Sequence, residues 1–202
     1  MRIEYSGHLG FEKKEYNDDD SPSQREETLR NSVKNRISTA ELSDIKIENV
    51  TDPIKPFIYS YHVRVPGYAQ RTGKRIFLQP AFFEHGVAPL FSASERKHEV
   101  YFHYPWLEED SVSIELPAGY TLDNPDAPSP IRSAPVTEYT PTIKVTKDGK
   151  SLFYNRSFYF GGGGNLVFPV TSYNSLKTLF DLINKADNHT ITLKQTAGAA
   201  GN

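Results

Sequence analysis

Alternation of apolar and polar side chains is the feature that most limits the fold of this chain. From Phe57 to Leu193, short runs place an apolar residue at every second position, and the clearest are Phe57–Val65 and Leu152–Phe160. Successive side chains of a β-strand point to opposite faces, so this spacing buries one face of a sheet. The pattern predicts a mainly β protein with an antiparallel, sandwich-like fold of about eight strands.

Two segments have helical spacing instead. Ser21 precedes Pro22 and is followed three residues later by Gln24, which is the form of a capping box, so we expect a helix over about 22–38. A second segment has apolar residues at positions i, i+3, i+4 and i+7, namely Leu176, Leu179, Phe180 and Ile183. This spacing predicts an amphipathic helix over about 172–186. We expect both helices to lie at the periphery of the sheets.

Turn signals divide the strands. Asp148-Gly149 between two alternating runs predicts a hairpin with a type I′ turn. A second hairpin is expected around Trp106–Asp110, with that segment as the connection. Residues 123–135 include four prolines and predict a loop or an extended edge segment. Gly161–Gly164 predicts a flexible break in the chain.

The length of 202 residues suits a single domain, which we place at 1–195, with a disordered tail at 196–202. The alternative is two packed modules, 1–90 and 96–195. Met1 is the only methionine, and the chain opens directly on a strand-like sequence. We therefore expect this chain to be a piece of a longer protein.

Charge and cysteine content exclude several classes of function. The net charge is −2, whereas a nucleic-acid-binding surface needs a basic excess, so no nucleic acid partner is expected. The absence of cysteine excludes a thiol nucleophile, a disulfide framework and a thiolate metal site on this chain. The sequence has no apolar run of transmembrane length, so we expect no membrane insertion.

Several motifs resemble parts of metal-binding or phosphate-binding sites, but each lacks a residue that such a site requires. His98 lacks a second histidine at metalloprotease spacing, because His103 follows one residue too late. Gly161–Gly164 lacks the Lys-Ser/Thr pair of a phosphate loop. Asn17–Asp20 is followed by Pro22, where a calcium loop requires a ligand. We therefore expect no catalytic residue, no metal site and no cofactor, with weak calcium binding and a small hydrolase as minor alternatives.

Three aromatic residues form the candidate surface for a ligand or partner: Tyr101, Tyr104 and Trp106. Aromatic rings at such a position can stack on the faces of sugars in a binding module. They can equally fill the space between sheets, which is the commoner role of buried rings. The sequence leaves both interpretations open. For Trp106 the two roles, ligand binding and packing, are about equally favoured, because it follows a proline in an expected turn.

Two segments carry a family resemblance: Arg96–Pro105, and Glu109–Tyr120, which ends in Ile-Glu-Leu-Pro-Ala-Gly-Tyr. With them the chain resembles the β-rich C-terminal region of bacterial secreted transglutaminase-like proteins. Tyr173–Leu193, a helix followed by a final strand, is also similar. The front half fits with the strand around Tyr5-Ser6-Gly7, the capped helix and a strand that ends near Asn49.

This resemblance implies a non-catalytic accessory domain. In such proteins the Cys-His-Asp catalytic set belongs to a preceding transglutaminase-like domain, and no position of this chain matches it. The expected role is to pack against that catalytic domain of the same polypeptide and to shape or present its substrate, in the periplasm or outside a bacterial cell. The alternative is a β-sandwich module that binds a cell-wall carbohydrate or peptide. A cell-envelope protein or glycan is then a further partner.

Overall fold

The computed structural model describes residues 1–196 of the chain. Within them the structure is mainly β, with thirteen strands that pair antiparallel and three α-helices, which confirms the predicted fold class. The contacts divide the chain into two compact units, one of residues Met1–Tyr68 and one that begins at Ala69. The single domain over 1–195, and the alternative modules 1–90 and 96–195, stay predictions.

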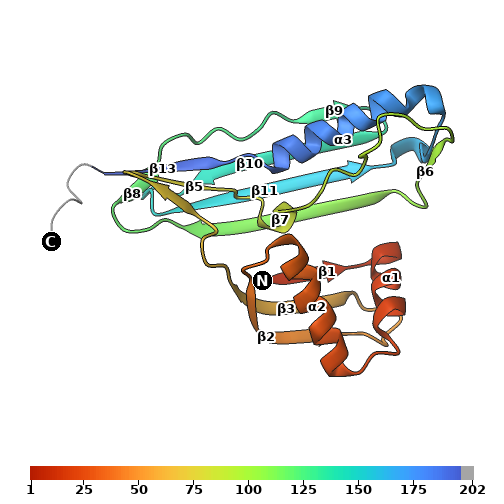
Figure 1. The fold of residues 1–202 in the computed structure, drawn as a ribbon, viewed down its shortest axis with the longest axis horizontal. Coiled ribbons are helices and arrows are strands. Elements are labelled where there is room, and N and C mark those ends of the chain that lie inside the picture. Colours follow the sequence, from red (N-terminus) through yellow and green to blue (C-terminus); the bar gives the residue numbers. More distant parts are fainter. Residues whose placement is uncertain (197–202) are drawn as a thin grey trace. The chain divides into compact units, whose positions relative to one another are not determined.

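The first unit combines three strands and two helices. In chain order its elements are β1 (Arg2–Tyr5), α1 (Gly7–Asn17), α2 (Pro22–Arg36), β2 (Glu41–Glu48) and β3 (Phe57–Arg64). The strands form one sheet in the order β1-β3-β2, with β3 in the centre (Figure 1). Phe57, Tyr59 and Tyr61 of β3 are buried, as the alternation predicts, and Ile58 between them is buried too. Leu29 and Val33 of α2 are also buried in this unit.

The sequence predicts one of the two helices of this unit but not the other. The capping box of α2 is present: the amide of Gln24 donates to Ser21 Oγ, and the amide of Ser21 donates to Gln24 Oε1 at 2.9 Å. The helix α1 lies in a segment for which the sequence indicated no helix. Its apolar residues Phe11 and Tyr16 are exposed, so no apolar stripe marks it. Gly10 faces the carbonyl of Tyr5, where a Cβ would lie 2.6 Å from the oxygen.

The second unit contains three sheets, each antiparallel. The largest has the order β7 (Trp106–Glu115), β11 (Ser151–Phe160), β10 (Thr137–Val145), β9 (Ile131–Ser133). The next has the order β4 (Gln70–Thr72), β5 (Arg75–Leu78), β13 (Ile191–Gln195), β8 (Tyr120–Leu122). The third is a two-stranded ribbon of β6 (Val100–Tyr101) and β12 (Val167–Phe168). Short 3₁₀ turns are η1 (Phe82–Glu84), η2 (Gly162–Gly164) and η3 (Val170–Ser172).

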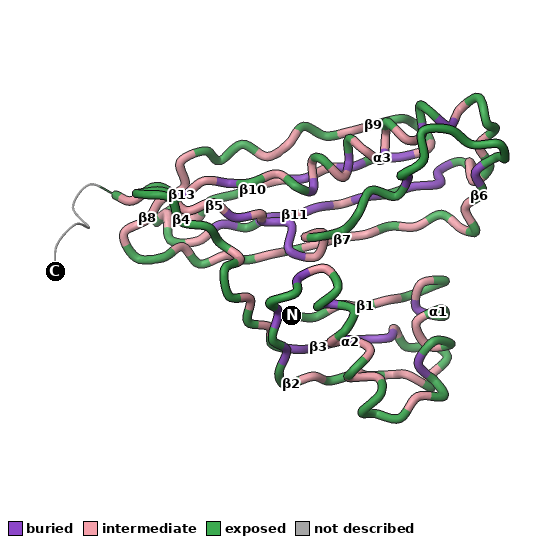
Figure 2. The backbone as a smooth tube through the Cα atoms, in the orientation of Figure 1, coloured by how far each residue is buried: buried purple, intermediate pink, exposed green. Residues whose placement is uncertain are grey.

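The helix α3 (Tyr173–Asp187) is part of the core of the second unit. It lies along the largest sheet, and buried positions follow both α3 and β11 (Figures 1 and 2). Phe180 of α3 packs against Phe158 and Phe160 of β11, with ring centroids 6.1 and 5.0 Å apart. The predicted helix over 172–186 is therefore confirmed, but it covers the sheet instead of lying at the periphery of the fold.

The expected hairpin around Trp106–Asp110 is wrong. These residues belong to β7, a continuous strand of ten residues that pairs with β11 along its whole length. The preceding strand β6 pairs with β12, which lies more than sixty residues further along the chain. The apolar runs on either side of Pro105 are therefore not partners, although both have the alternation of strands.

The hairpin at Asp148-Gly149 is confirmed, since β10 and β11 pair from Val145↔Leu152 onward. Its turn is not type I′, because only Gly149 has a positive φ, of 68°. The connection between the two strands has five residues, 146–150, and the amide of Gly149 donates to Thr146 O at 2.9 Å. Loops of this length are usually built around a type I turn, whereas a type I′ turn needs positive φ at both central residues.

Gly161 and Gly162 are buried and tightly packed, whereas Gly163 and Gly164 are exposed, and the expected flexible break stays a prediction. A Cβ on Gly162 would overlap the carbonyl oxygen of Pro135, and one on Gly161 would lie 2.8 Å from Pro105 Cα. The glycines are needed for this close approach. Within 123–135, the edge strand β9 confirms the expected extended segment. Of the expected disordered tail, 197–202 lies outside the described residues, and the amide of Thr196 donates to Gly119 O at 2.8 Å.

Candidate functional site

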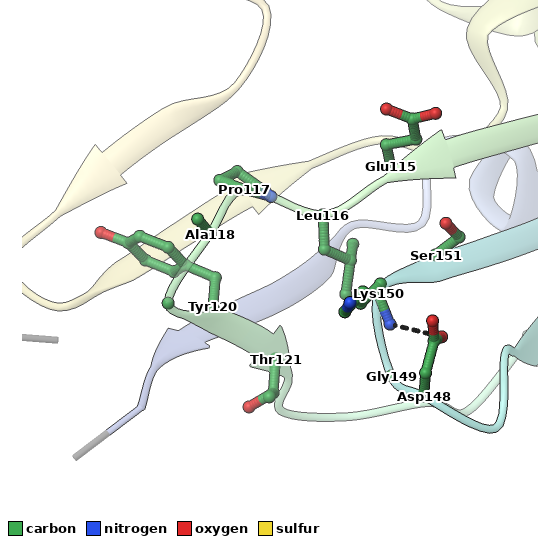
Figure 3. Close-up of a pocket in the computed structure, with 11 residues that line it drawn as sticks. Glu115, Leu116, Pro117, Ala118, Tyr120, Thr121, Asp148, Gly149, Lys150 and Ser151 are labelled. Atoms are coloured by element: carbon green, nitrogen blue, oxygen red, sulfur yellow. Dashed lines mark hydrogen bonds between the residues drawn. The ribbon is translucent and has the colours of Figure 1, made fainter. Parts of the chain in front are cut away.

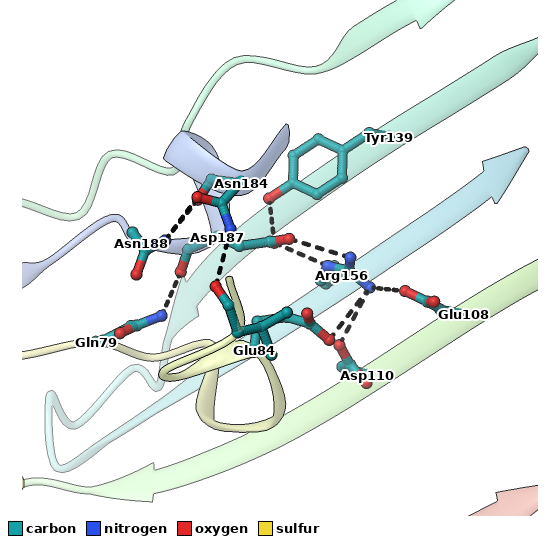
Figure 4. A network of polar contacts seen from close by, with 10 residues as sticks. Gln79, Glu84, Glu108, Asp110, Tyr139, Arg156, Asn184, Asp187 and Asn188 are labelled. Carbon is teal, nitrogen blue, oxygen red and sulfur yellow. Dashed lines mark hydrogen bonds and ion pairs between the residues drawn. The ribbon is translucent and has the colours of Figure 1, made fainter. Parts of the chain in front are cut away.

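A buried arginine is the centre of the most concentrated group of charges in the second unit (Figure 4). The side chain of Arg156, on β11, is 3% exposed. Its Nε and one terminal nitrogen donate to the two oxygens of Asp187, at 2.8 and 3.1 Å. The other terminal nitrogen donates to Glu108 Oε2 at 2.7 Å. Planar, two-pronged pairing of this kind is the strong form of the arginine–carboxylate interaction.

Two further carboxylates complete what we call the Arg156 cluster. Asp110 lies directly opposite Arg156 in the β7–β11 pairing, and its oxygen is 3.5 Å from the guanidinium. Glu84, in η1, has an oxygen 3.9 Å from the same nitrogen. The cluster thus joins β7, β11, α3 and η1 through one side chain. Alternation along the strands explains its position, because Glu108, Asp110 and Arg156 all fall on the face that α3 covers.

Asp187 occupies an unfavourable position that Arg156 compensates. It is the last residue of α3 and 4% exposed, and the carbonyl end of a helix repels a negative charge. Besides the two bonds from Arg156, its carboxylate accepts a hydrogen bond from Tyr139 Oη at 2.8 Å. The backbone carbonyl of Asp187 accepts another from Gln79 Nε2 at 2.7 Å. The carboxylate is therefore held by three donors in a buried environment.

Four carboxylates surround one guanidinium, and burial together with this excess of negative charge shifts the pKa of two of them, Glu84 and Asp110. Burial raises the pKa of Glu84 to about 7; the charge of Arg156 opposes this, and the other three carboxylates add to it. Burial likewise raises the pKa of Asp110 to about 6. Burial alone would lower the pKa of Arg156, but its bonds to Asp187 and the surrounding acids hold it above its ordinary value. The cluster can therefore bind protons near neutral pH.

The Arg156 cluster does not have the geometry of a metal site. Among residues 1–196, no group of three or more His, Cys, Asp or Glu side chains is arranged to hold a metal ion. In the cluster the guanidinium occupies the centre on which the carboxylates converge. The arrangement supports electrostatic cross-linking of four elements and proton uptake.

The structure separates the three aromatic residues of the predicted surface. Tyr101, on β6, is 58% exposed and pairs across the ribbon with Val167, which is 52% exposed. Its ring lies 5.1 Å from that of His103. Tyr104 is half-buried in the segment between β6 and β7. Tyr101 and Val167 together form an exposed apolar pair, which we call the ribbon pair.

Trp106 packs into the core of the second unit. Its ring centroid lies 4.8 Å from that of Phe160, 5.9 Å from Phe158 and 6.5 Å from Phe180. The start of β7 thus directs the indole toward α3. Of the predicted surface, Tyr101 is the member that is more than half exposed, and a ligand-binding role for Tyr101, Tyr104 and Trp106 stays a prediction.

A pocket of about 640 Å³ lies where β7 ends, at the end of the largest sheet opposite to Trp106 (Figure 3). It is bounded by Glu115–Thr121 and by the turn at Asp148–Ser151. The carboxylate of Asp148 already accepts from Lys150 N at 3.1 Å and from Thr146 Oγ1 at 2.6 Å. The carboxylate of the turn is thus used to hold the hairpin.

The Arg156 cluster was not anticipated from the sequence, although one signal of it was present. Arg156 is a charged residue at an inward position of an otherwise apolar alternation, between Tyr154 and Phe158. Such a residue must find a buried partner, since an unpaired charge in a core is very costly. The partners come from three other elements, and the spacing along the chain does not reveal them.

The family model described as "Domain of Unknown Function with solved-structure structure (DUF3858)" matches residues 74–193. The chain belongs to the DUF3858 family. The matched segment begins immediately before β5 and ends within β13, so the DUF3858 region includes α3 and every member of the Arg156 cluster. No curated protein and no solved structure matched the chain. In the described part of the chain, no helix is long and apolar enough to cross a membrane.

Proposed function

We propose that this DUF3858 chain is a non-catalytic accessory domain of a bacterial transglutaminase-like protein, located in the periplasm or outside the cell. It packs against the catalytic domain of the same polypeptide and shapes or presents that domain's substrate. The proposal is supported by the resemblance of Arg96–Pro105, Glu109–Tyr120 and Tyr173–Leu193 to the C-terminal region of such proteins. Membership of DUF3858 is compatible with it.

The observation that carries this proposal is the ribbon pair. Tyr101 and Val167 are directly opposite each other on a two-stranded ribbon, and each is more than half exposed. Two adjacent exposed apolar side chains offer another protein an apolar contact to cover. Full burial of a side chain of this size is worth about 1.5–3 kcal/mol. The ribbon pair is therefore the contact we assign to the catalytic domain.

The test measures association with the transglutaminase-like domain that the parent gene encodes upstream, expressed as a separate chain. Isothermal titration calorimetry compares the wild-type chain with the double variant Tyr101→Ser, Val167→Ser. We expect the dissociation constant to rise at least tenfold, which corresponds to about 1.4 kcal/mol. Leu182→Ser is the matched control, because Leu182 is 49% exposed on α3 and distant in sequence from the ribbon.

Two results would contradict the proposal. A parent gene without a transglutaminase-like segment removes the partner. Equal affinities of the double variant and the Leu182→Ser control remove the ribbon pair as the contact.

The alternative is a module that binds a cell-wall carbohydrate or peptide, favoured by the exposed ring of Tyr101 beside His103. A pull-down on purified peptidoglycan separates the two functions. Retention that Tyr101→Ala abolishes, without any affinity for the catalytic domain, would establish the alternative. Tyr101→Ala is the informative change here, since Trp106 packs in the core and its replacement would alter the fold.

A further inference from the structure

The segment that carries Glu84 is anchored in the core at its start and reaches the surface at its end. It runs from Pro80 through η1 to Val87, and we call it the η1 segment. Its buried residues are Pro80, Ala81 and Phe82. At its two ends, Gln79 Nε2 donates to the carbonyl of Asp187, and Asn184 Nδ2 donates to Val87 O at 3.1 Å. These two hydrogen bonds join the segment to the C-terminal turn of α3, in addition to its buried residues.

Glu84 is the carboxylate of the cluster that lies farthest from the guanidinium of Arg156. The guanidinium nitrogens lie 2.7–3.1 Å from Glu108 and Asp187 but 3.9 Å from Glu84. The charged groups that face Glu84 are Arg156 from β11, Glu108 and Asp110 from β7, and Asp187 from α3. One positive charge therefore meets four potential negative charges. Ionised Glu84 is repelled by three carboxylates, whereas protonated Glu84 is not.

We propose that the η1 segment is a pH-operated latch, which docks on the β7–β11 surface while Glu84 holds a proton and is released when Glu84 ionises. Release carries Glu84 into water, where its charge is solvated, and leaves Arg156 with its two closest partners. It also exposes Phe82 and opens the buried carboxylates to solvent. The switch is thus controlled by one side chain, and release also breaks the hydrogen bond from Asn184 to the carbonyl of Val87.

The sign and size of the effect follow from proton linkage. The docked state raises the pKa of Glu84 to about 7, and release returns it toward 4.5, so docking binds a proton. The docked state is therefore favoured at low pH and weakens as pH rises toward 7. With these two values, docking is about 70-fold more favourable at pH 5 than at pH 8.

Hydrogen exchange followed by mass spectrometry tests the latch on the whole chain. The reporting amides are those of Glu84, His85 and Val87, which donate to Ala81, Phe82 and Glu84 carbonyls. We expect their protection, corrected for the intrinsic pH dependence of exchange, to fall by tens of fold between pH 5 and pH 8. The strands β10 and β11 serve as the internal reference, with protection that does not change with pH.

Two variants decide which group controls the release. Glu84→Gln mimics the protonated side chain, so the η1 segment should stay protected at pH 8. Glu109→Gln is the matched control, because Glu109 is exposed on the opposite face of β7 and should leave the pH dependence intact. Constant protection of the wild type from pH 5 to pH 8 would overturn the proposal. A pH dependence that persists in Glu84→Gln would also overturn it and assign the change to another group, such as His85, whose Nδ1 lies 2.6 Å from Gln79 Oε1.

Discussion

Replacing Arg156 by methionine is the sharpest test of how the second unit is held together. The change keeps most of the side-chain length but removes the partner of Asp187, which is 4% exposed, and of Glu108. Breaking a buried ion pair by removing one member costs about 3–5 kcal/mol, because the remaining charge is left uncompensated. For Arg156→Met we take about 4 kcal/mol as the expected loss in the free energy of unfolding.

This loss converts into a measurable thermal shift. For a unit of about 130 residues, an unfolding entropy near 2.1 cal/mol/K per residue turns about 4 kcal/mol into a Tm lower by about 15 °C. Differential scanning calorimetry of the whole chain at pH 7.5 measures it. The deficit should shrink below pH 5, because the uncompensated carboxylates can then be neutralised by protons.

A double-mutant cycle and a surface control make the test specific. Asp187→Asn on the Arg156→Met background should cost less than the sum of the two single changes, with a coupling of about 2 kcal/mol or more. Arg132→Met is the control, since Arg132 pairs with Glu138 at 2.9 Å on an exposed surface, where such pairs contribute at most about 1 kcal/mol. If Arg156→Met destabilises no more than Arg132→Met, the Arg156 cluster does not stabilise the fold.

Three further predictions concern single side chains. Tyr139→Phe removes one of three donors to Asp187, and urea denaturation should show a loss of about 1–2 kcal/mol. Gly162→Ala places a Cβ onto the Pro135 carbonyl, so it should lower stability by more than about 3 kcal/mol; a smaller loss in the same assay would mean that the two loops separate easily. Trp106→Ala should cost about 3–5 kcal/mol, whereas Tyr101→Ala should stay within about 0.5 kcal/mol, and similar losses would contradict the packing described for the two rings.

The sequence predicted those elements whose signals are local. The capping box at Ser21, the i, i+3, i+4, i+7 spacing of α3 and the Asp148-Gly149 hairpin all act within a few residues, and all three elements are present. The helix α1 was missed because its exposed apolar residues give it no amphipathic pattern. Local chemistry thus determined which elements could be recognised.

Pairing between distant segments could not be predicted. The strands β6 and β7 are neighbours in sequence, yet β6 pairs with β12 and β7 with β11, because Pro105 and the packed residues Gly161 and Gly162 direct the chain elsewhere. The Arg156 cluster could not be predicted for the same reason, since its members lie up to 103 residues apart in the sequence, from Glu84 to Asp187. Alternation tells which face a residue occupies, but not which residue it meets there.

The position of β7 at the rim of its sheet gives its acidic residues a second consequence. Four of its ten residues carry carboxylates, and two of these, Glu108 and Asp110, turn inward to Arg156. An exposed edge strand can pair with a strand of another chain and so start aggregation. Charged side chains that point inward from the edge strand discourage this pairing. A copy of β7 laid alongside would bring like charges together and gain no guanidinium to balance them. The buried arginine thus allows a long border strand to remain acidic and resistant to self-association.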